Sequence, residues 1–253
     1  MKSPVYLGTC LLCCVLLTTG CGLGRAGDDR PATAATATAQ TADVARSPAT
    51  ATRERRRAAG LSPRQAVIAS WRKQRGVRSY RATHRSAGLG TTVTSSIEYV
   101  RPDRYHFVTR GKGYSTEAII IGRDEYSRRD NGAWEKPRPG GTTLSELLGV
   151  IQTQRAFDHE MATIRSVKLV GRKVLDGTPT RVYTYRTSDT DELAGRTIRT
   201  TSVEKLWVAV SDGLPRRHER RTTNKVGGQE LAVTGVTTYR DYNAKITIRR
   251  PAR

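Results

Sequence analysis

The chain has 253 residues, with 44 Lys and Arg against 23 Asp and Glu and a formal net charge of +21. This length suffices for one domain with a sizeable core, and such an excess of positive charge predicts an anionic partner. All four cysteines fall within the first 21 residues. Disulfides, cysteine-based zinc sites and cysteine nucleophiles are therefore excluded from the rest of the chain.

The first 20 residues have the pattern of a secretory signal peptide. Lys2 precedes an apolar run from Val5 to Leu17, and small residues follow this run. The run is shorter than the roughly 20 apolar residues that a membrane-spanning helix needs. The alternative is that the segment stays uncleaved as an anchor helix. Export of the chain from the cytoplasm is the prediction.

The stretch "TTGC" at 18–21 resembles a bacterial lipobox, in which small residues precede a cysteine that receives a diacylglyceryl group. Its last three letters match the pattern, whereas Thr18 stands where leucine is usual. The resemblance implies an extracytoplasmic lipoprotein anchored to a membrane through Cys21, since two acyl chains give stable anchoring. Gly22 after the cysteine implies the outer membrane in a Gram-negative cell. A Gram-positive cell would keep the protein on the outer face of its only membrane.

Residues 21–60 are rich in Ala, Thr and Arg and almost devoid of large apolar side chains. Because such a composition cannot offset the entropy of ordering the chain, it predicts a disordered tether. Its "RERRR" stretch at 53–57 is either a site for anionic lipid headgroups or a solvated run of charge. The remaining residues, 61–253, form the predicted domain.

The partner that the positive charge predicts depends on where the chain resides. An exported chain rarely meets nucleic acid, so no nucleic acid partner is expected. Anionic lipid, lipopolysaccharide or an acidic polymer is the expected counterpart, unless the arginine content reflects only the composition of the genome.

The domain is predicted to open with a helix at 62–76. Ser62 and Gln65 form a capping box, and the proline between them suits the first helical position. Val67 and Trp71 belong to an apolar stripe, and basic residues crowd the last turn, where the helix dipole favours them.

Beyond this helix the apolar period changes to two, which is typical of strands. In 91–100 alternate residues from Val93 to Tyr99 share one face, and 104–110 and 114–122 are also strand-like. Turn signals, among them Asn-Gly and Asp-Gly pairs that favour tight hairpins, separate such runs. They lie at 87–90, 101–104, 111–113, 130–132, 176–177, 212–213 and 227–228. The pattern predicts an antiparallel meander of about six strands, a helical interruption, and about six more strands.

The interruption is a predicted helix at 143–160. Thr143 and Glu146 form its capping box, and apolar residues recur at helical spacing from Leu144 to Ile151. A long antiparallel sheet must curl or close to protect its edges, and helices can cover its open side.

Two stretches in order along the chain carry a second resemblance: "PDRYHFVTRG…STEAIIIGRDEYSRRDNGAWEKP" and "LVGRKVLDGTPTRVYTYR…EKLWVAVSDGLPRRHERR…TTYRDYN". They are similar to the LolA/LolB/LppX lipoprotein-carrier superfamily over about residues 61–251. The resemblance implies an α+β fold, a curved and half-open antiparallel β-barrel of about 11–12 strands with helices covering its concave face. It also implies a cavity that binds or transfers lipids or the acyl chains of lipoproteins, without catalysis.

The cavity candidates are apolar or aromatic residues at alternate positions of the strands, with one from each helix. They are Trp71, Ile97, Tyr99, Tyr105, Phe107, Ile119, Ile121, Leu148, Trp207 and Tyr239. Ordinary core packing is the alternative for each of them. With only two phenylalanines and many Thr and Tyr residues in the chain, the cavity is expected to be modest in size and partly polar.

The histidines and the known catalytic motifs bear on whether the chain is an enzyme. The four histidines, His84, His106, His159 and His218, show no zinc-binding spacing and are more typical of solvated or hydrogen-bonded side chains. The sequence contains no P-loop and no Gly-x-Ser-x-Gly elbow. The "DHE" triplet at 158–160 is more typical of a polar helix face than of a catalytic pair. Neither an enzyme nor a metal or other cofactor is expected.

Two alternatives to lipid binding remain open. One is an envelope sensor or interaction module resembling the first domain of the periplasmic regulator RseB. The other is a basic scaffold for anionic envelope polymers, whose binding would weaken with salt. The predicted tether argues against a carrier that travels freely between membranes. The chain is expected to act as a monomer.

Overall fold

The computed structural model describes residues 60–88, 90–136, 154–193, 196–226 and 229–252. The predicted signal peptide 1–20, Cys21 and the tether up to residue 59 lie outside the described residues. So do the loop and the first part of the second predicted helix, 137–153, including Leu148. Within the described residues, no helix is both long enough and apolar enough to cross a membrane.

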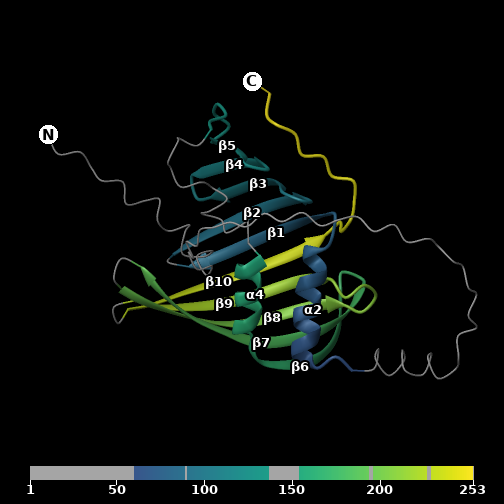
Figure 1. Cartoon of the computed structure of the whole chain (residues 1–253). Helices are drawn as coiled ribbons and strands as arrows, with labels where there is room; N and C mark the ends of the chain where they lie inside the picture. The colour runs from purple at the N-terminus through teal and green to yellow at the C-terminus, as the bar shows by residue number, and fades with distance from the viewer. Residues whose placement is uncertain (1–59, 89, 137–153, 194–195, 227–228, 253) are drawn as a thin grey trace, which may run out of the picture. The chain divides into compact units, whose positions relative to one another are not determined.

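Ten strands form one fully antiparallel sheet in the described part of the chain. Their spatial order is β5-β4-β3-β2-β1-β10-β9-β8-β7-β6, so β1 pairs with β10 and joins the two halves of the chain (Figure 1). The strands are β1 (Ser79–Gly88), β2 (Thr91–Val100), β3 (Arg104–Gly111), β4 (Tyr114–Ile121), β5 (Asp124–Arg129), β6 (Arg165–Leu175), β7 (Thr178–Leu193), β8 (Arg196–Ala209), β9 (Pro215–Val226) and β10 (Gln229–Arg240).

The sheet is open, because β5 and β6 stand at opposite ends of the strand order. The predicted antiparallel meander is confirmed, with five described strands on each side of the helical interruption rather than about six. The expected count of 11–12 strands is not reached in the described residues. The segment 245–251 near the C-terminus forms no strand.

The predicted turn signals at 101–104, 111–113, 176–177 and 212–213 fall at the junctions of consecutive paired strands. Asp176 and Gly177 both have positive φ, 48° and 75°, and connect β6 to β7. Positive φ at both central residues matches the right-handed twist of the flanking strands, which is why Asp-Gly pairs favour this turn. The Asp-Gly pair at 212–213 lies within the longer connection between β8 and β9, where Gly213 has a positive φ of 68°.

The register of the strands defines two faces of the sheet. Ile97 pairs with Ala82 on one side and with Phe107 on the other, and Ala82 also pairs with Tyr239. Side chains of directly paired residues point to the same side of a sheet. We call the side that carries these four residues the inner face and the other side the outer face.

Two helices, α2 (Pro63–Arg75) and α4 (Gln154–Thr163), lie on the inner face over the half formed by β6 to β9 (Figure 1). Val67 of α2 and Phe157 of α4 are 0% and 4% exposed and share one core cluster with Tyr183 and Leu206 of the sheet. The first predicted helix, with Pro63 at its first position and basic residues in its last turn, is confirmed. The described helices thus lie over one half of the inner face, which is less than the complete cover that the resemblance implied.

The C-terminal segment passes along one end of the β1–β5 half of the sheet. The Asn243 amide donates to the Ser79 carbonyl at 2.9 Å, the Arg104 guanidinium donates to the Ile248 carbonyl at 3.5 Å, and Arg250 forms an ion pair with Asp124. Asp241 and Asn243 have positive φ, which turns the chain away from β10. This turn and the burial of Ile248 explain why the segment does not continue as a strand.

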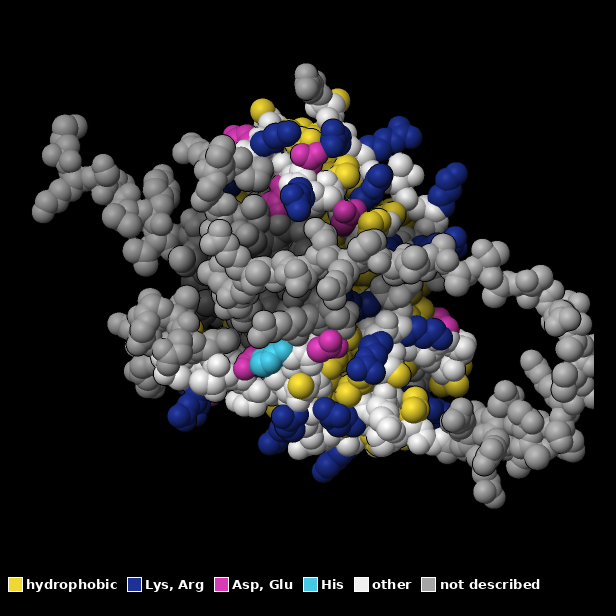
Figure 2. Space-filling model, viewed as in Figure 1, with side chains coloured by type: hydrophobic (Ala, Val, Ile, Leu, Met, Phe, Trp, Pro, Cys, Tyr) yellow, Lys and Arg dark blue, Asp and Glu magenta, His cyan; other side chains and the backbone are white. Residues whose placement is uncertain are grey.

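The surface of the described domain is strongly basic. Figure 2 shows Lys and Arg side chains spread over the visible face, with few acidic side chains among them. This distribution agrees with the composition, in which basic residues outnumber acidic ones 44 to 23.

Candidate functional site

A cavity of about 710 Å³ lies over the inner face. Side chains from β1, β2, β3, β7, β8, β9 and β10 line it, together with residues from α2 and α4. Its volume falls in the range of roughly 300–1,000 Å³ that is usual for sites of small molecules and lipids. The cavity exists because one face of seven strands points toward two helices that cover only part of it.

One half of the cavity is aromatic. Ring centroids lie 5.0 Å apart between Tyr80 and Tyr99, 5.0 Å apart between Tyr99 and Tyr105, and 5.7 Å apart between Tyr105 and Phe107. These rings come from adjacent strands at paired or alternate positions, so the strand register places them in a row. Such a row offers a continuous apolar surface to a ligand.

The tyrosines of this row are uncharged at neutral pH. Burial raises the pKa of Tyr80 and Tyr105 far above the usual value. Burial likewise raises the pKa of Tyr239 to about 12. The aromatic half of the cavity therefore carries no charge of its own from its phenols.

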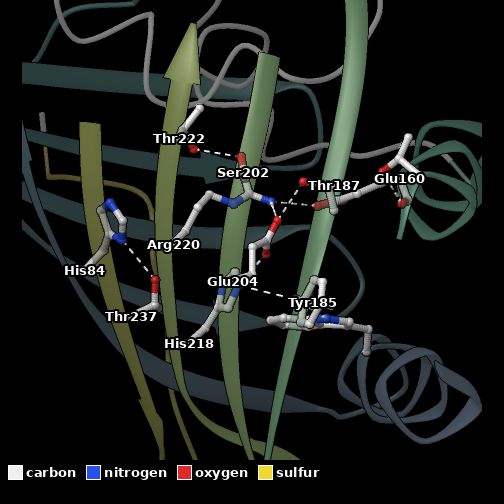
Figure 3. Close-up of polar contacts among 12 residues, drawn as sticks. His84, Glu160, Tyr185, Thr187, Ser202, Glu204, His218, Arg220, Thr222 and Thr237 are labelled. Carbon is white, nitrogen blue, oxygen red and sulfur yellow. Dashed lines mark hydrogen bonds and ion pairs between the residues drawn. The ribbon is translucent and has the colours of Figure 1, made fainter. Parts of the chain in front are cut away.

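The other half contains four ionisable residues that we call the charged cluster: Glu160, Glu204, His218 and Arg220 (Figure 3). Nε2 of His218 lies 2.6 Å from Oε2 of Glu204, and Nη2 of Arg220 lies 3.1 Å from Oε1 of Glu204. The same Nη2 atom lies 3.4 Å from Oε1 of Glu160 on α4. Two carboxylates thus share the guanidinium of Arg220.

Glu204 is the buried centre of the charged cluster, with 1% of its side chain exposed. Burial by itself raises the pKa of the Glu204 carboxyl, but the charge of Arg220 and the hydrogen bonds from His218 and Thr187 outweigh this effect. The pKa of Glu204 is therefore held well below its usual range. The hydroxyl of Thr187 contributes by donating to Oε1 of Glu204 at 2.9 Å.

Neutral hydrogen bonds connect the charged cluster to α2. The indole Nε1 of Trp71 donates to the hydroxyl of Tyr185 at 3.3 Å, and this hydroxyl lies 3.3 Å from Nε2 of His218. The indole also stands edge-on to the imidazole of His218, with 5.1 Å between ring centroids. Trp71 therefore links the helix, the charged cluster and, through a 6.2 Å contact with the Tyr239 ring, the aromatic row.

His84 lies between the two halves. Its Nδ1 atom is 2.9 Å from the hydroxyl of Thr237. Burial, with the nearby charges of His218 and Arg220, lowers the pKa of His84 to about 4. The ring is therefore neutral at physiological pH.

The hydroxyl groups beside the charged cluster have hydrogen-bond partners within the protein. The hydroxyl bonded to His218 is that of Tyr185, whereas Ser202 pairs with Thr222 through a contact of 2.9 Å. In the described part of the chain, no group of three or more His, Cys, Asp or Glu side chains is arranged to hold a metal ion.

Six of the ten predicted cavity residues line the observed cavity. They are Trp71, Ile97, Tyr99, Tyr105, Phe107 and Tyr239. Leu148 lies outside the described residues.

Ile119 and Ile121 were predicted to face inward and instead lie on the outer face. The inner-face residues Phe107 and Tyr105 pair with Ala118 and Ile120, so the isoleucines at odd positions point the other way. Ile120 is fully buried and belongs to the inner cluster with Phe107. The prediction failed because three successive isoleucines give no alternation from which to read the face.

Trp207 was also predicted to face inward and lies on the outer face. It pairs with Val182 and Arg217, whereas its neighbour Leu206 packs on the inner face, in the core cluster that also contains residues of α2 and α4. The indole of Trp207 contacts two cations. Nζ of Lys205 lies 4.9 Å and Cζ of Arg217 lies 5.6 Å from the ring centroid. The run "LWVAV" is apolar at every position, so it too carries no information about the face.

The charged cluster itself was missed in sequence. His218 and His84 were predicted to be hydrogen-bonded or solvated, and the structure shows hydrogen bonds for both. Glu204 and Arg220 were not predicted as site residues. For Arg220 the reason is that β9 is polar on both faces and so shows no amphipathic signal. The one available signal was a lone acidic residue in the apolar surroundings of β8.

No protein-family model matches the sequence, and no curated protein sequence matches it. The fold is similar to that of the lipoprotein LppX of Mycobacterium tuberculosis, with 15% identity and a TM-score of 0.49 over 74% of this chain and 98% of the other. It is similar to LprF of Mycobacterium bovis, with 15% identity and a TM-score of 0.47 over 76% and 97%. A DUF1329 family protein from Desulfovibrio piger is a more distant match, with 9% identity and a TM-score of 0.26 over 75% and 96%.

Proposed function

We propose that this chain is a membrane-anchored, extracytoplasmic lipoprotein that binds acyl chains of lipids or of other lipoproteins in the inner-face cavity, without catalysis. The observation that carries the proposal is the cavity of about 710 Å³ with its row of aromatic side chains from β1, β2 and β3. The motif order along residues 61–251 supports it independently.

An apolar ligand is favoured by the chemistry of this row. Each CH₂ group that leaves water contributes about 0.8 kcal/mol, and the uncharged phenols and Phe107 offer the surface against which it packs. The loss of motional freedom on binding offsets part of this gain, so an acyl chain of many carbons is needed for stable binding. The charged cluster at the opposite end limits how far such a chain extends.

In this proposal the helices cover the concave side of the sheet, and Leu148 remains a predicted cavity residue that lies outside the described residues.

The binding test uses the full chain carrying Cys21→Ser, which removes the proposed attachment point. We expect saturable binding of a fluorescent fatty acid with one site per chain, and co-purified lipid in the mass spectrum of an organic extract. Protein that carries no lipid and shows no saturable binding would overturn the proposed function. Titration of lysozyme, also a basic protein, under the same conditions controls for adsorption of the probe to positive charge.

The proposed anchor is Cys21 after cleavage of residues 1–20, followed by the tether 21–60 and the lipid-binding domain 61–253. The small residues before the cysteine and the absence of cysteine after it in the sequence support this arrangement. We expect Cys21→Ser to shift the protein from the membrane fraction to the soluble fraction of the producing bacterium, and Cys13→Ser to leave it in the membrane. A Cys21→Ser protein that stays in the membrane would show that the apolar run 5–17 is the anchor.

A further inference from the structure

The cavity differs from a simple apolar pocket in the way its charges are balanced. Arg220 is a cation, but its guanidinium is shared by the carboxylates of Glu204 and Glu160 at 3.1 Å and 3.4 Å. Glu204 is ionised, because its pKa is held well below the usual range by Arg220 and its hydrogen bonds despite burial. The charged half of the cavity therefore has no uncompensated positive charge with which to attract an anion.

Two nitrogen atoms of the cavity lining nevertheless lack a hydrogen-bond partner within the described part of the chain. Nε of Arg220 and Nε2 of His84 are buried and make no hydrogen bond there, although both residues line the cavity. Buried polar groups in native structures are nearly always paired, so unpaired ones beside a cavity point to a ligand atom. Arg220 offers an N–H donor, and the neutral imidazole of His84 offers one donor or acceptor, depending on its tautomer.

The group that matches this arrangement is an uncharged oxygen. A carboxylate or phosphate would become a third anion beside Glu204 and Glu160, and like charges at such distances in a buried site repel strongly. An ester carbonyl or a hydroxyl accepts from Arg220 without adding charge, and a hydroxyl serves either tautomer of His84. Such oxygens occur where an acyl chain is esterified to a glycerol-like alcohol.

Resting on the proposed function, we propose that the cavity selects neutral acyl esters, with the chain along the aromatic row and the ester or alcohol oxygen at Arg220 and His84. Free fatty acids and lipids with phosphate headgroups bind more weakly. Arg75 and Arg101 line the cavity as well, but both side chains are exposed, Arg75 lies over the Phe157 ring, and Asp103 accompanies Arg101 in the lining. They therefore lie outside the buried half that selects the headgroup.

The test compares ligands that share one oleoyl chain and differ only in the headgroup. The full chain carrying Cys21→Ser is loaded with a fluorescent fatty acid, and 1-oleoylglycerol, oleate and 1-oleoyl-lysophosphatidylglycerol are titrated as competitors below their micellar concentrations. Repulsion between an anionic headgroup and the carboxylates of Glu204 and Glu160 supports a preference of about tenfold or more for 1-oleoylglycerol over the two anions. Equal displacement, or stronger displacement by either anion, overturns this inference and leaves the proposed function standing. Failure of both the probe and 1-oleoylglycerol to bind overturns the proposed function.

Substitutions of single residues test which side chains cause the preference for the neutral ester. Arg220→Lys keeps the positive charge beside Glu204 and removes the Nε–H donor, so the preference is expected to fall to about threefold or less. Arg217→Lys is the matched control, because it lies on the same strand but pairs with Trp207 on the outer face, and its preference should stay unchanged. His84→Leu is the second variant if Arg220→Lys fails to fold, and it is also expected to reduce the preference. Retention of the full preference in a folded Arg220→Lys or His84→Leu protein contradicts the proposed contacts.

Discussion

Glu204 shows how one buried charge is held in an otherwise apolar region. Its carboxylate is 1% exposed and receives hydrogen bonds from Thr187 and His218 as well as the charge of Arg220. An ionised carboxylate without such partners would cost far more free energy to bury than a hydrogen bond returns. The four residues therefore depend on one another, and removing one leaves the others uncompensated.

Glu204→Ala is expected to lower the free energy of unfolding by about 3 kcal/mol, because it leaves Arg220 with only the more distant carboxylate of Glu160. Urea-induced unfolding followed by circular dichroism measures the change. Glu219→Ala is the matched control, since Glu219 forms an ion pair with Arg217 at 2.8 Å while 35% of its side chain is exposed. Its effect is expected to stay below about 1 kcal/mol. Similar losses in the two variants would contradict the buried role of Glu204.

His84 predicts a pH dependence of stability. The pKa of its ring is lowered to about 4 by burial and by the charges of His218 and Arg220, whereas the ordinary value is 6.5. Between these values the unfolded chain binds a proton that the folded chain does not, so acidification from pH 6.5 to pH 4 favours unfolding. The loss assigned to His84 is roughly 3 kcal/mol over this window.

The measurement is the free energy of unfolding at several pH values, in the unsubstituted chain and in His84→Gln. The substitution removes the titrating group, so the unsubstituted chain is expected to lose roughly 3 kcal/mol of unfolding free energy relative to His84→Gln as the pH falls from 6.5 to 4. The carboxylates, Glu204 among them, contribute equally to both curves and cancel in the difference. Parallel curves would show that His84 does not titrate in this window.

At the scale of elements, the register of the strands decides which side chains reach the cavity. β4 presents Ala118 and Ile120 to the inner face, since these residues pair with Phe107 and Tyr105. The outer face of the same strand carries Glu117, which contacts His106 at 2.8 Å and also pairs with Arg128, within a polar row across β2 to β5. A shift of one residue would exchange the two faces and bury this polar row.

Two alanine substitutions in β4 test the face assignment. Ile120→Ala is expected to cost about 3 kcal/mol of unfolding free energy, because Ile120 is 0% exposed within the inner cluster. Ile121→Ala is expected to cost about 1 kcal/mol, because that side chain is partly exposed on the outer face. Thermal or urea unfolding measures both, and a larger cost for Ile121→Ala would reverse the assignment of faces.

At the scale of the whole molecule, the positive charge and the cavity are separate features. The excess of basic residues is spread over the surface, as Figure 2 shows for one face, whereas the charge inside the cavity is balanced. Exposed charges act on an anionic membrane surface through an interaction that salt screens within about 10 Å at 0.1 M. The electrostatic field of the surface charges therefore has little effect on the binding of a neutral ligand in the cavity.

The two features are expected to respond differently to salt. Co-sedimentation of the Cys21→Ser chain with phosphatidylglycerol vesicles should fall severalfold between 50 mM and 500 mM NaCl. Binding of 1-oleoylglycerol in the cavity should change less than twofold over the same range. Phosphatidylcholine vesicles serve as the control and should retain little protein at either salt concentration. A cavity affinity that falls with salt as steeply as vesicle binding would instead favour a scaffold for anionic polymers.

The sequence by itself determined the local structure of this protein. Turn residues such as Asp176 and Gly177, the proline that opens α2, and the period of two in β2 each depend on backbone preferences that neighbouring residues express directly. These signals predicted the antiparallel meander, the first helix and most of the aromatic row.

Only the tertiary structure decided which face an unbroken apolar run presents and which distant polar residues meet. Ile119, Ile121 and Trp207 lie in runs without alternation, so their direction follows from pairing with His106, Arg104 and Arg217, respectively, on other strands. The charged cluster combines residues from α4, β8 and β9 that are up to 60 positions apart. Local backbone preferences do not predict such contacts, because the free energy that favours these contacts arises only after the sheet and the helices have packed together.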